Sequence, residues 1–209
     1  MEQKFVINIG RQLGSGGKQV GTLLAQRLGV KCYDKELIGL AAEESGIATE
    51  LFEQVDERES KPLLSTLLGY LRSPSMEEGG RVNPLSAESL FQIQSDVIRR
   101  LAERESCIFV GRCADYILRD HPRCINIFLT ASEEARIARI CQREVCCEER
   151  ARERMWRGDK CRADYYNYYT TRSWGMASSY DLCINTSKLG VEATVELILD
   201  FVKRTLQTE

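Results

Sequence analysis

Residues 10–20 read GRQLGSGGKQV, between an apolar run at residues 5–9 and a helical spacing of apolar side chains over residues 20–28. Glycine lets the backbone N–H groups of such a strand-to-helix turn face an anion, and the helix N-terminus adds partial positive charge. Lys18 supplies a mobile charge that can reach the β- and γ-phosphates of a nucleotide. The pattern predicts a phosphate-binding loop to which six residues contribute: Gly14, Ser15, Gly16, Gly17, Lys18 and Gln19.

The loop departs from the usual G-x-x-x-x-G-K-[ST] pattern at two positions. Gln12 stands at the first glycine position, and Gln19 replaces the hydroxyl residue that normally holds Mg²⁺. Gln19 can approach a metal ion through its amide oxygen or through water, so no direct metal ligand is predicted. Two alternatives are a glycine-rich turn without a ligand and a G-x-G-x-x-G dinucleotide loop. The second fits less well because its third glycine falls at Gln19.

Apolar runs and helical patterns alternate along the chain. Besides residues 5–9, strands are expected at 107–110, 124–129, 182–185 and, more weakly, 30–33; helices are expected at 20–28, 36–45, 87–104, 133–156 and 191–206. Ser132 is the expected N-cap of the helix that starts at residue 133. Near-continuous apolar runs are typical of strands covered on both faces. The alternation therefore predicts an α/β domain over residues 1–209, with helices on both faces of a parallel sheet.

Residues 60–86 interrupt this regular alternation. They hold Pro62, Pro74, Pro84 and the pair Gly79-Gly80. Proline and glycine favour turns over regular elements, so this stretch is interpreted as an irregular excursion and not as a second core.

Two charged residues follow expected strands directly. Asp34 comes after the strand at 30–33, and Arg112 follows Gly111 after the strand at 107–110. In open α/β sheets ligands bind beyond the carboxyl ends of the strands. There Asp34 can orient an acceptor group or a metal-bound water, and Arg112 can bind an acceptor phosphate in bidentate fashion. The alternatives are a helix N-cap for Asp34 and a surface position for Arg112.

A basic segment spans residues 150–165. Phosphoryl transfer needs positive charge around the transferred group and exclusion of water, and Arg154 and Arg157 are the candidates for that catalytic role. A segment hinged near Gly158 can close as a lid. Asp159 and Arg162 lie three residues apart, so on a helix they share a face and can recognise the edge of a pyrimidine base. Interleaved glutamates leave a solvated helix face as the alternative.

The composition limits the classes of partner. The net charge of −2 gives no basic field for nucleic acid or an anionic membrane. No run approaches the roughly 20 apolar residues that a membrane span needs, and no secretory signal is recognisable. The nine cysteines then favour reduced thiols in a cytoplasmic protein. Their spacing lacks zinc-site patterns, so small buried hydrophobes are the favoured interpretation.

These motifs, taken in order, resemble the cytidylate kinases, and most closely the cytidylate kinase-like branch. The resemblance covers nearly the whole chain apart from residues 60–86. It rests on the glycine-rich loop, Tyr33-Asp34, Gly111-Arg112, IFLTAS at 127–132, Asp159 with Arg162, and DLCINTS at 181–187.

The resemblance implies a P-loop NTPase fold, a three-layer sandwich around a five-stranded parallel sheet. It implies an acceptor-binding helical insertion over residues 36–104, a lid over 150–165, ATP and Mg²⁺ as cofactors, and CMP or dCMP as acceptor. By position, Lys18 matches the phosphate-binding lysine, and Asp34, Arg112, Asp159 and Arg162 match acceptor-binding residues.

The chain departs from the family pattern on the acceptor side. Cys113 replaces the acid of a Gly-Arg-Asp motif, Lys35 replaces a small hydroxyl residue, and Leu40 replaces an arginine. Two alternative functions therefore stay open. One is a kinase of another small metabolite on the same scaffold, and the other is a non-catalytic nucleotide-binding regulatory protein.

Overall fold

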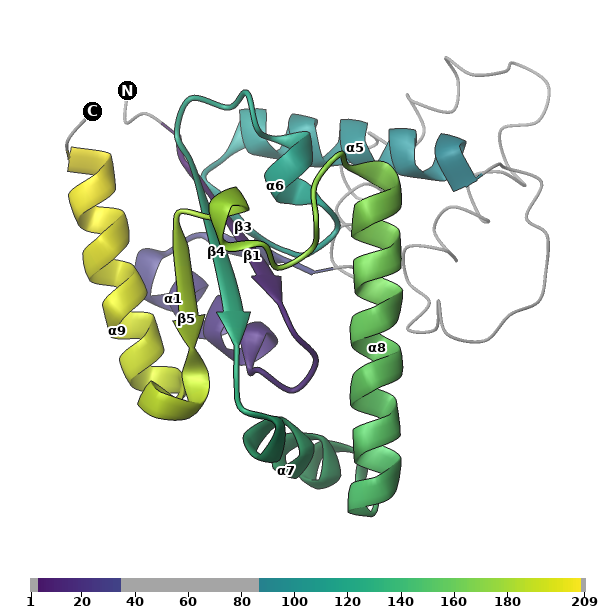
Figure 1. Cartoon of the computed structure of the whole chain (residues 1–209). Helices are drawn as coiled ribbons and strands as arrows, with labels where there is room; N and C mark the ends of the chain where they lie inside the picture. Colours follow the sequence, from purple (N-terminus) through teal and green to yellow (C-terminus); the bar gives the residue numbers. More distant parts are fainter. Residues whose placement is uncertain (1–3, 35–86, 208–209) are drawn as a thin grey trace.

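Five parallel strands form the centre of the protein, for which a computed structural model describes residues 4–34 and 87–207 (Figure 1). The strands are β1 (Val6–Arg11), β2 (Lys31–Tyr33), β3 (Cys107–Val110), β4 (Cys124–Thr130) and β5 (Leu182–Asn185), in the order β2-β3-β1-β4-β5. Every neighbouring pair is parallel. All five lie where the sequence predicts strands. The helix expected at 36–45 and the excursion at 60–86 lie outside the described residues.

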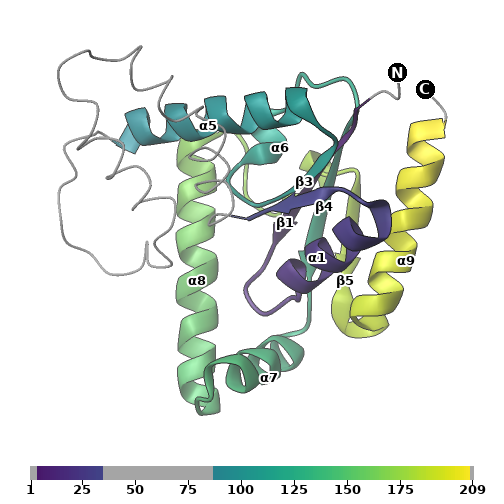
Figure 2. The ribbon, with the colours of Figure 1, turned by 180° about the vertical axis from the view of Figure 1, so that it is seen from behind.

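Helices cover both faces of the sheet, which gives the expected three layers. α1 (Gly17–Leu28) and α9 (Thr186–Gln207) lie side by side on one face (Figure 2). α5 (Ala87–Arg104) and the short α6 (Ala114–Ile117) cover the other. Each interface buries an apolar cluster, so the strands are buried on both faces, as their continuous apolar runs indicate.

The helix expected over residues 133–156 is two helices, and that expectation was wrong. α7 (Glu133–Glu144) ends at Val145, whose φ of 51° lies in the left-handed region, and α8 (Glu148–Tyr169) then runs in a new direction (Figure 1). The Ser132 cap is confirmed, because its side chain accepts a hydrogen bond from Ala135 N. In α9, Gly190 interrupts the helix with a φ of 75°, so the continuous part begins at residue 191, as expected. One turn of 3₁₀ helix (Ala177–Ser179) precedes β5.

Gly158 lies inside α8, buried against the glycine-rich loop. The helix continues through it without a break. A Cβ atom at this position would lie 2.7 Å from Leu13 Cδ2, so the missing side chain is what lets α8 approach the loop. Close packing, and not a break in the helix, accounts for this glycine in the structure. Leu13 and α8 share a small apolar cluster with Ile137, Ile140, Ala151 and Met155.

Replacing Gly158 tests this packing. We expect Gly158→Val to lower the free energy of unfolding by about 1–3 kcal/mol, because an overpacked contact forces Leu13 or α8 to shift. Urea denaturation measures the change. Arg150→Val, at an exposed position of the same helix, controls for the helix propensity of valine. If both variants are as stable as the wild type, the contact does not limit the approach of α8.

Candidate active site

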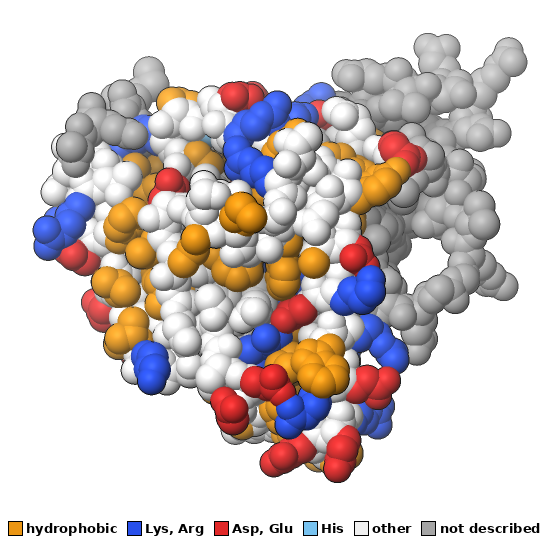
Figure 3. Space-filling model, in the orientation of Figure 1, with side chains coloured by type: hydrophobic (Ala, Val, Ile, Leu, Met, Phe, Trp, Pro, Cys, Tyr) orange, Lys and Arg blue, Asp and Glu red, His pale blue; other side chains and the backbone are white. Residues whose placement is uncertain are grey.

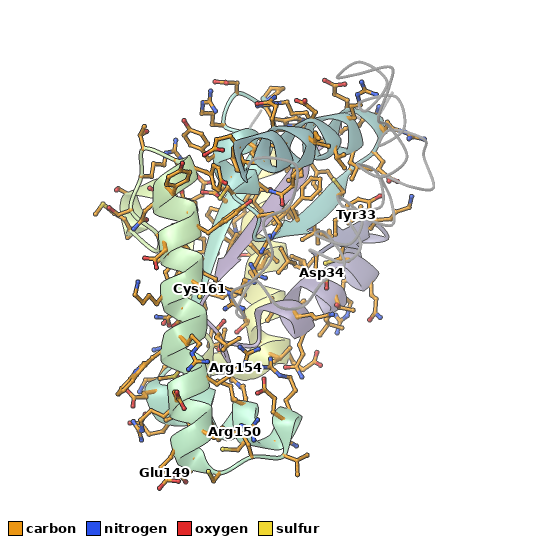
Figure 4. All side chains as sticks on the ribbon, turned by 90° about the vertical axis from the view of Figure 1, so that its right-hand side faces the viewer. Tyr33, Asp34, Glu149, Arg150, Arg154 and Cys161 are labelled. Atoms are coloured by element: carbon orange, nitrogen blue, oxygen red, sulfur yellow. The ribbon has the colours of Figure 1, made fainter. Side chains whose placement is uncertain are left out.

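A cavity of about 490 Å³ lies where the carboxyl ends of the central strands meet α7 and α8. Arg11 ends β1, Asp34 follows β2 and Arg112 follows β3, and all three line the cavity. Lys18 at the start of α1 lines it too, as do Arg143, Arg154, Cys161 and Arg162 of the two helices. Figure 4 shows Arg154 and Cys161 on the side of α8 that faces Asp34. The parallel sheet thus brings residues from distant parts of the sequence to one edge.

The glycine-rich loop is held by its carbonyl groups. The carbonyl oxygens of Leu13, Gly14 and Ser15 accept hydrogen bonds from Arg136 (2.7 Å), Arg139 (3.1 Å) and Thr186 (2.7 Å), respectively. In a planar trans peptide the N–H points opposite to the C=O. The N–H groups of Gly14 and Gly16 therefore face away from these partners, the orientation that suits an anion. Arg136, Arg139 and Thr186 were not predicted from the sequence, because their role depends on how α7 and β5 pack.

Asp159 takes part in the same anchoring. Its Oδ1 accepts a hydrogen bond from Leu13 N at 2.7 Å, and its Oδ2 is paired with Arg136. Only 17% of the Asp159 side chain and 8% of the Arg136 side chain are exposed. Asp159 does not line the cavity, whereas Arg162 does. The Arg162 Nη1 atom lies 3.8 Å from Asp159 Oδ1. The structure therefore gives Asp159 contacts with the loop, and the predicted recognition of a base by this residue stays a prediction.

Three arginines crowd the cavity wall. The Arg11 side chain passes so close to Gly111 that any side chain at that position would collide with its guanidinium. Burial, together with the charges of Arg162 and Arg112, lowers the pKa of Arg11 well below its usual value. Burial also lowers the pKa of Arg162 to about 10, although Asp159 opposes that shift. Arginine side chains stay protonated in proteins at neutral pH, so this wall of the cavity attracts an anion.

Arg112 shows most directly where an anion would bind. Its guanidinium lies over the ring of Tyr165, 5.1 Å from the ring centre. Its Nε and Nη1 atoms are buried and have no hydrogen-bond partner among residues 4–34 and 87–207. Buried donors are normally satisfied, and an unsatisfied one costs about 1–3 kcal/mol. A phosphate in the cavity would satisfy both donors.

Arg11 was missed from the sequence, although a signal was present. It stands at the end of a buried strand beside a glycine-rich turn. The same criterion selected Arg112 after β3.

The remaining predicted residues are divided between cavity and surface. Lys18 and Asp34 form an ion pair of 2.9 Å within the cavity lining. Arg154 also lines the cavity, with Glu144 at 3.7 Å.

Arg157 does not line the cavity. It is exposed and paired with Glu153 at 2.9 Å on the helix surface. Gln19 is likewise exposed and outside the cavity lining. Acidic and basic side chains interleave over α7 and the adjoining end of α8 (Figure 3), as expected of a solvated face.

The cysteines give no sign of a metal centre. All nine are free thiols. Within the described parts of the chain, no group of three His, Cys, Asp or Glu side chains is placed to hold a metal ion. No helix in those parts is long and apolar enough to cross a membrane.

Comparison with known proteins places these features in a family. The model of the cytidylate kinase-like family matches residues 6–188. Cytidylate kinases of Halobacterium salinarum and Methanothrix thermoacetophila are 29% and 30% identical to the chain over 120 and 132 residues. These regions cover 56% and 63% of this chain, and 62% and 74% of the two relatives. The match thus spans somewhat less than two thirds of the first relative.

Solved structures share the fold. An uncharacterized protein from Eubacterium ventriosum superimposes with a TM-score of 0.72 at 28% identity, over 96% of this chain and 99% of that one. Shikimate kinase from Bacteroides thetaiotaomicron superimposes with a TM-score of 0.51 at 11% identity, over 95% and 98% of the two chains. The second likeness concerns the fold alone.

The anchoring role of Asp159 can be tested by substitution. Asp159→Asn leaves Arg136 mostly buried without its carboxylate, so we expect a loss of up to about 3–5 kcal/mol in the free energy of unfolding. Asp164→Asn is the matched control, since Asp164 pairs with Lys160 at 2.6 Å on the exposed side of the same helix. An exposed pair contributes about 0–1 kcal/mol. Denaturant titration of both variants gives the comparison, and equal losses would contradict the anchoring role.

Proposed function

This chain belongs to the cytidylate kinase-like family, and from that premise we propose that it is an ATP-dependent phosphotransferase. It moves the γ-phosphate of ATP to a nucleoside monophosphate, CMP or dCMP. Its partners in this proposal are small nucleotides.

The observation that carries the proposal is the arginine wall with the unpartnered donors of Arg112. Charged groups that are buried and close together are costly unless a counter-charge joins them. A phosphate monoester supplies that counter-charge and has the geometry for bidentate binding by guanidinium. Arg11, Arg112 and Arg162 then hold the phosphate of the acceptor, while Lys18 and the glycine-rich loop hold those of ATP.

The lid belongs to the same proposal. Arg154 already lines the cavity, whereas Arg157 is exposed in this structure. Residues 150–165 lie within α8, so movement of this part of the chain would be movement of a helix. Closure onto the phosphates would bring further positive charge to the transferred group and exclude water.

Asp34 fits the role of holding Mg²⁺. The ion binds one or two carboxylates together with substrate phosphates and water. Among the described residues, Asp34 is a carboxylate of the cavity lining that lies beside Lys18, at 2.9 Å. Gln19 would contribute only through water. When bound, Mg²⁺ neutralises negative charge on the phosphates, and this chain's own task is to orient the ion and the substrates.

One observation favours each of the two alternative functions. Cys113 is buried at the start of α6 and cannot supply the acid of a Gly-Arg-Asp motif, which favours a different small-metabolite acceptor. The exposed Gln19 after the loop lysine favours a nucleotide-binding regulatory protein. The position of Lys18 and Arg154 in the cavity argues against that second alternative.

Nucleotide consumption tests the proposed function. We expect ATP to be consumed with CMP or dCMP, and less with UMP. We expect no consumption in excess chelator, because the negative charge of the phosphates then lacks the Mg²⁺ counter-ion. Lys18→Ala should abolish turnover and weaken ATP binding by on the order of 1.5–3 kcal/mol, the value of a hydrogen bond to a charged group. Lys203→Ala, at an exposed position of α9, is the control. Turnover of a non-nucleotide acceptor alone, or ATP binding without turnover, would favour the respective alternative.

The lid is tested by hydrogen exchange. We expect the amides of residues 150–165 to exchange more slowly with a bisubstrate analogue bound, because the anionic ligand draws the arginines of α8 together. The amides of residues 191–206 in α9, away from the cavity lining, are the internal control. Equal protection with and without the analogue would indicate a static, solvated helix.

A further inference from the structure

Asp115 lines the cavity, and the proposed phosphoryl transfer gives it no role. It lies in α6, just after Gly111-Arg112, and only 7% of the residue is exposed. Its Oδ2 accepts a hydrogen bond of 2.6 Å from the hydroxyl of Tyr166 in α8. Burial raises the pKa of Asp115, and the hydrogen bond from Tyr166 opposes that shift. Packing alone does not require a buried carboxyl group beside a cavity, and such groups are typical of functional sites.

Aromatic side chains line the same cavity as this carboxyl. Tyr166, which holds it, is one of them, and Tyr180 is another. Tyr180 and Trp174 both pack on Phe128, with ring centres 4.9 and 5.5 Å from it. The hydrogen bond from Tyr166 orients Asp115, and the rings give the cavity lining flat, apolar surfaces.

The cavity lining therefore combines two kinds of surface. Arg11, Arg112 and Arg162 are cationic, whereas Asp115 is a single polar group that shares the lining with apolar aromatic rings. Tyr165 links the two kinds, because its ring lies under the Arg112 guanidinium. The ligand that matches this arrangement has an anionic group and a flat ring with a hydrogen-bond donor.

We propose that Asp115, oriented by Tyr166, is the carboxylate that recognises the base of the acceptor nucleotide, through its exocyclic amine. This inference rests on the proposed function and names the determinant of its specificity. A carboxylate accepts hydrogen bonds and, when ionised, donates none. The amine of cytosine can donate to it, whereas uracil presents a carbonyl oxygen at the same position and leaves two acceptors facing each other.

Asp159 is the competing candidate for this role, and the two carboxylates can be distinguished by their contacts. Asp159 is held by Leu13 N and Arg136 and lies outside the cavity lining. Asp115 has one oxygen held by Tyr166 and lies in the lining. A carboxylate offers about four lone-pair sites, so Asp115 keeps capacity for a ligand donor.

The test compares kcat/KM for CMP and UMP in wild type, Asp115→Asn and Asp159→Asn. We expect Asp115→Asn to reduce the preference for CMP by roughly tenfold or more, since the amide can turn its NH₂ toward the uracil carbonyl. The Kd of ATP should stay unchanged. Asp159→Asn should lower stability and leave the CMP:UMP ratio as in wild type.

Tyr166→Phe provides a second variant in case Asp115→Asn does not fold. It keeps the ring and removes the hydroxyl that orients the carboxylate, so the CMP preference should fall by a smaller factor. Near-UV circular dichroism confirms that each variant is folded. The role of Asp115 is overturned if the CMP:UMP ratio of kcat/KM is unchanged in the folded variants. It is also overturned if that ratio changes only in Asp159→Asn.

The wild-type result separates the two proposals. Turnover of CMP with an unchanged ratio in the Asp115 and Tyr166 variants rejects this inference alone. No turnover of any nucleoside monophosphate by the wild type rejects the proposed function, and this inference with it.

Discussion

Arg136 and Asp159 hold one residue of the glycine-rich loop, Leu13, by its two backbone polar groups, and the rest of the site depends on that contact. Arg136 donates to the carbonyl of Leu13 while Asp159 accepts from its N–H, and the two side chains pair with each other. A mostly buried ion pair is stabilising only when its remaining polar atoms are hydrogen-bonded, and the loop backbone supplies these bonds. These contacts connect the loop to α7 and α8. The buried Gly158 lets α8 come close enough for the contact to form.

With the loop fixed, the arginines of the cavity lie close together at an energetic cost. Burial and mutual repulsion lower the pKa values of Arg11 and Arg162, and Arg112 has buried donors without partners in the described part of the chain. Such an arrangement lowers the stability of the protein without a ligand, and a bound anion would relieve the repulsion. The ion pair between Lys18 and Asp34 offsets part of this charge at the loop. Strain of this electrostatic kind is expected where an anionic substrate binds.

Another part of the cavity lining has a different physical character. The hydrogen bond from Tyr166 holds the Asp115 carboxyl in a lining that also contains aromatic rings, where an incorrect partner would leave polar atoms unpaired. Phosphate contacts provide affinity that is insensitive to the base, whereas a buried hydrogen-bonding group discriminates among bases. In the proposed complex, affinity would therefore come from Arg11, Arg112 and Arg162, and specificity would come from Asp115 with Tyr166.

The sequence by itself determined the strands, most helices and the glycine-rich loop, because hydrophobic periodicity and glycine spacing are local properties of the chain. It also placed Asp34 and Arg112 at the edge of the sheet where both line the cavity, since residues after parallel strands share one edge. It missed the break at Val145, where an exposed residue takes a left-handed conformation with no glycine to mark it. Only the tertiary structure showed that Asp159 contacts the loop while Asp115 lines the cavity. Both acids lie on helices at unremarkable spacings, and which one meets a ligand depends on the packing of α6, α7 and α8 around the sheet.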